Sequence, residues 1–118
     1  MGDTEPTTPP TDLRCDVFRN GQMAWVQPFG ELDLDSAHRV EAALEELRGD
    51  GCPELVLDLR GLTFMDSTGL RLAIRWDTAA REDGFRFAIV PGDEVVQRVF
   101  RLTGMDSHLT VEEPPPDP

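Results

Sequence analysis

The first part of the chain shows the alternation of apolar and polar side chains that is typical of β-strands. Residues 13–18 alternate in this way, and residues 23–27 form a second, more apolar segment. Asn20-Gly21 lies between the two segments, and this pair is favoured in the tight turns that join antiparallel strands. Pro28, near the end of the second segment, favours an edge strand or a bulge. The chain is therefore predicted to begin with a β-hairpin.

Three further apolar segments have the length of strands. Residues 55–59 are almost continuously apolar, which suits a central strand that is covered on both faces and paired with parallel neighbours. Residues 85–90 and 109–111 are expected to form the remaining strands. Parallel pairing requires crossover connections, so helices are expected between these segments.

Apolar residues recur at spacings of three and four between the predicted strands, which indicates amphipathic helices. The first has Asp35 or Ser36 as its N-cap and stops at Gly49 and Gly51, and the second continues through Ala80 and ends before Gly84. The apolar face of the third is expected to comprise Val95, Val96, Val99, Phe100 and Leu102. The resulting order, ββαβαβαβ, predicts an α/β fold with a mixed five-stranded sheet, an N-terminal β-hairpin and packed helices.

The two ends of the chain differ in composition from the rest. Seven of the ten prolines lie in residues 1–12 or 112–118, and these segments also carry acidic residues without any basic ones. Proline-rich, acidic segments with almost no large apolar residues do not bury enough surface to fold. We therefore expect disordered tails at residues 1–12 and 112–118 and one domain spanning residues 13–111, a common domain size.

Charge and composition exclude several classes of function. The net charge is −12, which disfavours binding to nucleic acid or to an anionic membrane. All eleven basic residues are arginines, so enzymes that require a catalytic or phosphate-binding lysine are excluded. No apolar run approaches the ~20 residues that span a bilayer, and residues 1–12 do not resemble a secretion signal. With Cys15 and Cys52 as its only cysteines, the chain is expected to be cytoplasmic.

Asp66-Ser67-Thr68 stands where a strand passes into a helix, and this cluster has two interpretations. Such a cluster is most often an N-cap, and Gly69 then allows the helix to pack closely against the preceding strand. A hydroxyl in the first helical turn also projects outward beside backbone N–H groups, where the fold tolerates a phosphate. Ser67 is therefore a candidate phosphorylation site whose charge would change binding without unfolding the domain.

Two other chemistries fit the sequence less well. A serine hydrolase needs a base beside a nucleophile on a Gly-x-Ser-x-Gly turn, but Ser67 has different flanking residues, His38 lies on a helix and His108 in a loop. A metal site would have to use carboxylates that lack a fixed loop spacing. These carboxylates are Glu31, Asp33, Asp35 and Asp66. We therefore expect a protein without catalytic activity, cofactor or metal.

Residues 64–70, Phe-Met-Asp-Ser-Thr-Gly-Leu, resemble the signature of STAS domains, specifically those of bacterial anti-sigma factor antagonists. Residues 30–33, 55–59 and 102–105 resemble further segments of that family and occur in the same order. The resemblance covers residues 13–111 and implies the STAS fold. Four ordered segments together make it specific.

The resemblance implies a partner-switching mechanism. The unphosphorylated protein would bind an anti-sigma factor that is also a serine kinase, and would thereby free a sigma factor for transcription. The kinase would phosphorylate Ser67 and the complex would dissociate, while a serine phosphatase would reverse the modification. Asp58 is expected to support the loop from the end of its strand. The residues expected on the partner-binding face are Glu31, Asp33, Asp66, Ser67, Thr68, Gly69, Leu70 and Arg71.

Two departures from the family pattern leave alternatives open. Family members often have a small residue after the leucine of the signature, where this chain has Arg71, which either selects a partner or points to solvent. Many members end in a helix after the last strand, but the prolines after Val111 preclude a helix here. A second function is consistent with the same fold: an accessory subunit of a transport complex that binds proteins without a phosphorylation switch.

Overall fold

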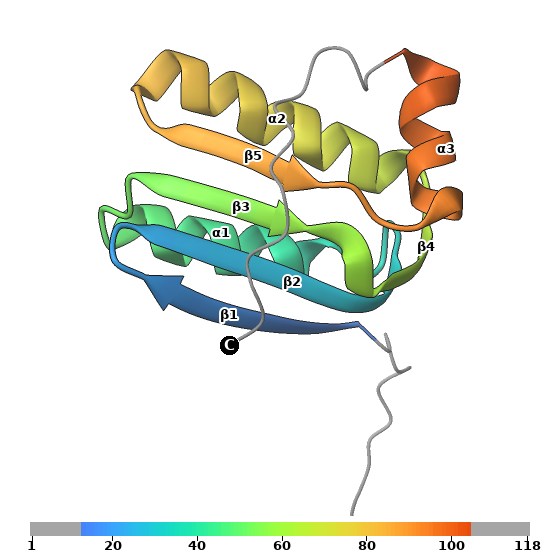
Figure 1. Cartoon of the computed structure of the whole chain (residues 1–118), viewed down its shortest axis with the longest axis horizontal. Coiled ribbons are helices and arrows are strands. Elements are labelled where there is room, and N and C mark those ends of the chain that lie inside the picture. The colour runs from blue at the N-terminus through green and yellow to red at the C-terminus, as the bar shows by residue number, and fades with distance from the viewer. Residues whose placement is uncertain (1–12, 105–118) are drawn as a thin grey trace, which may run out of the picture.

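The structure, a computed structural model, describes residues 13–104 of the chain (Figure 1). Strands β1 (Arg14–Asn20) and β2 (Met23–Leu32) are antiparallel neighbours joined by a tight turn. Gly21 in that turn has a φ of 64°, a backbone conformation that glycine adopts without steric cost. The predicted hairpin is therefore confirmed.

The remaining strands of the main sheet run parallel to β2. The order is β1-β2-β3-β5, where β3 spans Glu54–Asp58 and β5 spans Arg86–Val90. Strand β3 lies between β2 and β5 and is buried on both faces, as its continuous apolar run predicts. The α/β fold with a mixed five-stranded sheet is confirmed.

The fifth strand is short and spans residues 62–65, where the sequence indicated only a passage from a strand into a helix and no separate strand. Strand β4 (Leu62–Met65) follows a 3₁₀ turn, η2 (Leu59–Gly61), and pairs in parallel with the end of β2. The pairing shifts register between Gly30 and Glu31, so β4 extends β2 beyond the point where β3 ends. The strand predicted at residues 109–111 lies outside the described residues.

Helices α1 (Ala37–Gly49) and α2 (Ser67–Asp83) pack on one face of the sheet and close the main core with it. Helix α3 (Glu94–Thr103) instead contacts β4 and α2 at the end of the molecule (Figure 1). Because α3 does not lie over the sheet, its buried stripe is narrower than predicted: Val95 and Leu102 are exposed. No helix within residues 13–104 combines the length and the apolar character needed to cross a bilayer.

The start of α1 is held by Asp33 and not by the predicted capping side chains. Ser36 occupies the N-cap position, but its hydroxyl donates to the Glu31 carbonyl oxygen over 2.7 Å and makes no cap hydrogen bond. The Asp33 carboxylate accepts from the backbone N–H groups of Asp35 and Ser36, at 3.1 Å each. A side chain before the helix therefore organises the loop that joins β2 to α1.

Candidate functional site

The parallel pairing of β2 with β4 brings together two segments that are far apart in the sequence. Glu31 pairs with Phe64 and Leu32 with Met65, so the loop after β2 lies beside the start of α2 (Figure 1). The Asp66 backbone N–H donates to the Leu32 carbonyl oxygen over 3.3 Å, which continues the pairing by one residue. The predicted site residues on both segments thus lie at one end of the sheet.

Asp66 is the N-cap of α2. Its backbone is extended, and its carboxylate accepts a 2.8 Å hydrogen bond from the Thr68 N–H. The Asp66 carbonyl oxygen accepts from the Gly69 N–H over 3.1 Å. The first turn of α2 therefore begins at Ser67, with a carboxylate already placed at the positive end of the helix dipole.

Ser67 is exposed, and its hydroxyl makes no hydrogen bond to any residue from 13 to 104. Arg71 on the same helix is also exposed and forms no ion pair with any residue in that range. Thr68 is half-buried. The Ser67 hydroxyl therefore takes part in no hydrogen bond that holds residues 13–104 together, and its side chain is exposed.

Gly69 and Leu70 face the core, although the resemblance places them on the partner-binding face. Leu70 is 5% exposed. A Cβ on Gly69 would lie 2.5 Å from the Met65 Cγ and 2.9 Å from the Leu32 Cδ2, far inside van der Waals contact. Both residues hold the first turn of α2 against the core. At position 69 a larger residue would push α2 away from β4.

Asp58 holds the turn η2, which leads into β4 and the start of α2. Its side chain is fully buried and accepts from the Arg60 guanidinium, with Nη2 at 2.7 Å and Nε at 3.0 Å. The same carboxylate accepts the Arg60 backbone N–H and so caps η2, the turn that leads into β4. This is the supporting role expected for Asp58 at the strand end.

Comparison with known proteins identifies this arrangement. A family model described as "Mlab, STAS domain" matches residues 17–112, most of the chain. The protein belongs to the STAS-domain family. The anti-sigma-B factor antagonist of Staphylococcus aureus is 30% identical to this STAS domain over 102 residues, which cover 86% of this chain and 94% of the relative.

Solved structures agree with that assignment. The crystal structure of an anti-sigma factor antagonist from Mycobacterium paratuberculosis superposes with a TM-score of 0.75 at 27% identity and covers 92% of each chain. Bacillus SpoIIAA, an anti-sigma factor antagonist, has the same fold at lower identity in two forms. The unphosphorylated form has a TM-score of 0.71 at 18% identity, with 86% of this chain and 89% of that chain covered. The phosphorylated form has a TM-score of 0.66 at 17% identity, with 86% and 92% covered.

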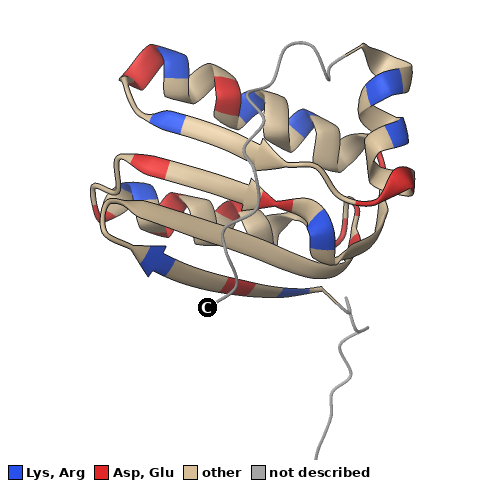
Figure 2. Ribbon diagram, viewed as in Figure 1, with Lys and Arg blue, Asp and Glu red and all other residues tan. Residues whose placement is uncertain are grey.

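The surface around Ser67 in this STAS domain is acidic and carries exposed apolar side chains that the sequence analysis missed. Leu34, in the loop after β2, is 76% exposed, and Phe64, on β4, is 43% exposed. Acidic residues lie in the same loop and at the start of α3 (Figure 2). Phe64 lies beside Thr63 on β4 and both side chains are exposed, so the side chains of this strand do not alternate between buried and exposed.

Within residues 13–104, neither His38 nor any other side chain hydrogen-bonds the Ser67 hydroxyl. His38 is exposed on α1, and His108 lies outside the described residues. Within residues 13–104, no group of three His, Cys, Asp or Glu side chains gathers closely enough to hold a metal ion.

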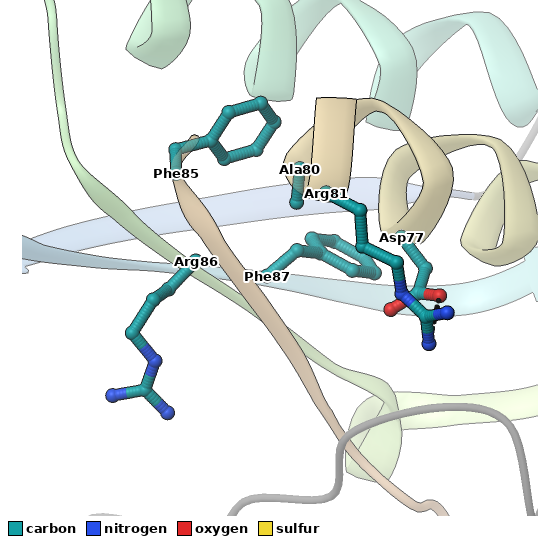
Figure 3. A pocket seen from close by; sticks show the side chains of 6 residues that line it. All are labelled: Asp77, Ala80, Arg81, Phe85, Arg86 and Phe87. Carbon is teal, nitrogen blue, oxygen red and sulfur yellow. Dashed lines mark ion pairs between the residues drawn. The ribbon is translucent and has the colours of Figure 1, made fainter. Parts of the chain in front are cut away.

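A pocket of about 160 Å³ lies between the C-terminal half of α2 and strand β5 (Figure 3). The Asp77–Arg81 ion pair, 3.0 Å long, and two phenylalanine rings contribute to its lining. Ten helical residues, ~15 Å along the axis, separate Ser67 from Asp77. The pocket is therefore not part of the surface around Ser67.

Proposed function

We propose that this STAS domain is an anti-sigma factor antagonist whose binding to an anti-sigma factor is switched off by phosphorylation of Ser67. In the unphosphorylated state it binds an anti-sigma factor that is also a serine kinase and so releases a sigma factor. The kinase transfers the γ-phosphoryl group of ATP to the Ser67 oxygen, with loss of the hydroxyl proton and release of ADP. A serine phosphatase hydrolyses the phosphoester with one water molecule, which restores the hydroxyl and releases inorganic phosphate.

The observation that carries the proposal is the position of Ser67, exposed and without a hydrogen-bond partner among residues 13–104, at the first residue of α2. A modification there breaks no contact with the described core. The names of the relatives support the class of partner, and Bacillus SpoIIAA shows that a protein with this fold exists in both phosphorylated and unphosphorylated forms.

The surroundings of Ser67 explain why a phosphate would act as a switch. Asp66, Glu31 and Asp33 already make this end of the sheet negative. A phosphate adds about −1.5 to −2 charges. A partner that packs against Ser67 would have to bury that charge close to the Asp66 carboxylate, and uncompensated burial of charge is costly. Phosphorylation therefore weakens the complex while the fold stays intact.

The proposed contact surface combines three kinds of side chain. Glu31 and Asp66 supply negative charge, Leu34 and Phe64 supply apolar area, and Arg71 supplies a cation on the first turns of α2. A partner that fits would present basic residues around an apolar centre, the common arrangement of protein interfaces.

The test is a binding measurement with a candidate anti-sigma factor kinase and a mass-spectrometric map of the phosphorylated residue. We expect Ser67→Ala to bind as tightly as the unmodified protein and to accept no phosphate, and Ser67→Asp to bind at least ~10-fold more weakly, or about 1.4 kcal/mol. Thr78→Asp is the matched control, because Thr78 is exposed on the same helix away from the proposed surface. The proposal fails if Ser67→Asp binds as tightly as Thr78→Asp. Equal binding is the result expected for an accessory subunit of a transport complex that has no phosphorylation switch.

A further inference from the structure

The sheet has a second face, opposite α1 and α2, that carries a row of apolar side chains. Phe18, Trp25, Val56 and Ala88 pair in register across the four strands β1, β2, β3 and β5. Val90 lies two residues further along β5. Figure 1 views the sheet from this side, with α1 behind it. We call the surface formed by these five residues the second face.

No described helix packs against the second face. The buried apolar side chains of all three helices belong to the main core, whereas Trp25, Val56 and Val90 form a separate cluster with Met23, all from strands. Yet Trp25 is 4% exposed, Val56 1% and Val90 2%.

Sheet neighbours alone do not produce such burial. Side chains stand perpendicular to a sheet, so neighbours flank them sideways and leave their outer ends open to water. Removing that surface from water requires a second layer. The layer covers β2, β3 and β5 but not β1, because Phe18 at the sheet edge stays 42% exposed.

We propose that residues 105–111 of this chain lie across the second face and form that layer. The segment starts where α3 ends, at Gly104, and contains Met105, Leu109 and Val111. The other segment outside the described residues, 1–12, has no large apolar residue after Met1. The C-terminal segment is therefore the part of the chain that is able to bury Trp25 and Val56.

Length and charge agree with this placement. Seven extended residues reach up to ~25 Å, whereas the three strands to be covered span only ~10 Å. The apolar residues of the segment are flanked by acids: Asp106, Glu112 and Glu113. Arg86 lies two residues before Ala88 on β5 and so on the same face; it exposes 62% of its side chain and pairs with Glu54. The prolines that start at Pro114 lack backbone N–H groups and end the segment.

Trp25 reports directly on the proposed contact. In the full chain with Trp76→Phe, Trp25 is the only tryptophan, so its emission and its quenching by acrylamide measure the cover of the second face. We expect Leu109→Asp and Val111→Asp each to raise the quenching constant severalfold and to shift the emission to the red. Thr110→Asp is the matched control: in an extended segment it points away from the sheet, so it should leave Trp25 protected.

The proposal is overturned if the acrylamide quenching constant of Trp25 is the same in Leu109→Asp as in Thr110→Asp. It is also overturned if protection of Trp25 depends on protein concentration and sedimentation shows a dimer, because a second copy would then cover the face. In case Trp76→Phe does not fold, the unmodified chain provides the second measurement. NMR should show contacts between the Trp25 ring and the methyl groups of Leu109 or Val111, and their absence rejects the proposal. Neither experiment involves Ser67, so a negative result would reject the placement of residues 105–111 without contradicting the proposed phosphorylation switch.

Discussion

Replacing Asp66 with alanine removes the side-chain cap of α2 and leaves the Ser67 hydroxyl in place. The lost interaction is the 2.8 Å hydrogen bond from the Thr68 N–H, together with a carboxylate at the positive end of the helix. N-cap substitutions of this kind cost about 1 kcal/mol. For a domain of this size, that corresponds to a fall of about 4–8 °C in Tm. Asp66→Asn retains the acceptor and loses only the charge, so we expect about half of the effect or less.

Urea and thermal unfolding followed by circular dichroism measure the effect. Asp83→Ala is the control, since Asp83 is the last residue of the same helix and caps nothing. Removing a negative charge from a helix C-terminus should leave stability unchanged or slightly raise it. Equal stability of Asp66→Ala and Asp83→Ala would show that the Asp66 cap contributes nothing and that another interaction holds the start of α2.

The same residue tests the electrostatics of the proposed switch. A phosphate on Ser67 gains from the helix dipole but is repelled by the Asp66 carboxylate, and two exposed charges a few ångströms apart interact by about 1 kcal/mol in water. Phosphorylation should therefore be more favourable to folding in Asp66→Asn than in the unmodified protein, by about that amount. The unmodified protein and Asp66→Asn, each with and without the phosphate, give four unfolding curves. Their free energies of unfolding yield the coupling between the phosphate and Asp66, which should shrink as salt is added. A coupling of zero would place the phosphate away from Asp66.

Four further substitutions and the titration of one thiol give predictions that follow from the described contacts. Asp58→Asn should lower the free energy of unfolding by about 2 kcal/mol, measured in urea, because it weakens buried charge-assisted hydrogen bonds. Gly92→Ala should destabilise by about 1–3 kcal/mol, because its Cβ would lie 2.6 Å from the Leu59 carbonyl oxygen. Gly49→Ala, with nothing within 4 Å and a helical position, should instead stabilise by about 0.5–1 kcal/mol. Burial raises the pKa of the Cys15 thiol to about 11, so its alkylation should stay slow at pH 9 and accelerate towards pH 11. The thiol ionises more readily in the unfolded chain than in the folded one, so the free energy of unfolding should fall as the pH rises above 9. In Cys15→Ala this fall should be smaller than in the unmodified protein.

The parts of the fold that local chemistry determines were predictable from the sequence. Asn20-Gly21 suffices to place the hairpin, because few other pairs adopt the required turn. The apolar run at residues 55–59 likewise indicates a doubly covered strand. Asp66 was predictable as a cap, since its side chain acts within its own helix turn.

The features that depend on distant contacts were not predictable. Strand β4 has four residues, of which the middle two are exposed, so it shows neither alternation nor a continuous apolar run. It is a strand because the end of β2 offers a parallel edge after a register shift. The exposure of Val95 and Leu102 has a similar origin: they belong to an apolar helix face, but among the described elements α3 packs mainly against β4 and α2, and these two side chains stay exposed.

The structure separates residues that hold the start of α2 from the residue that would carry the signal. Asp66 and Gly69 are tied into the fold by a cap and by close packing against Met65, so their replacement changes stability and binding together. Ser67, between them, makes no hydrogen bond through its hydroxyl to any residue from 13 to 104, so its replacement should change binding far more than stability. A loss of binding by Ser67→Asp at unchanged Tm therefore reports a charge read by a partner. The same loss with a destabilisation well above the ~1 kcal/mol expected from repulsion by Asp66 would instead place Ser67 among the structural residues and remove the basis for a reversible switch.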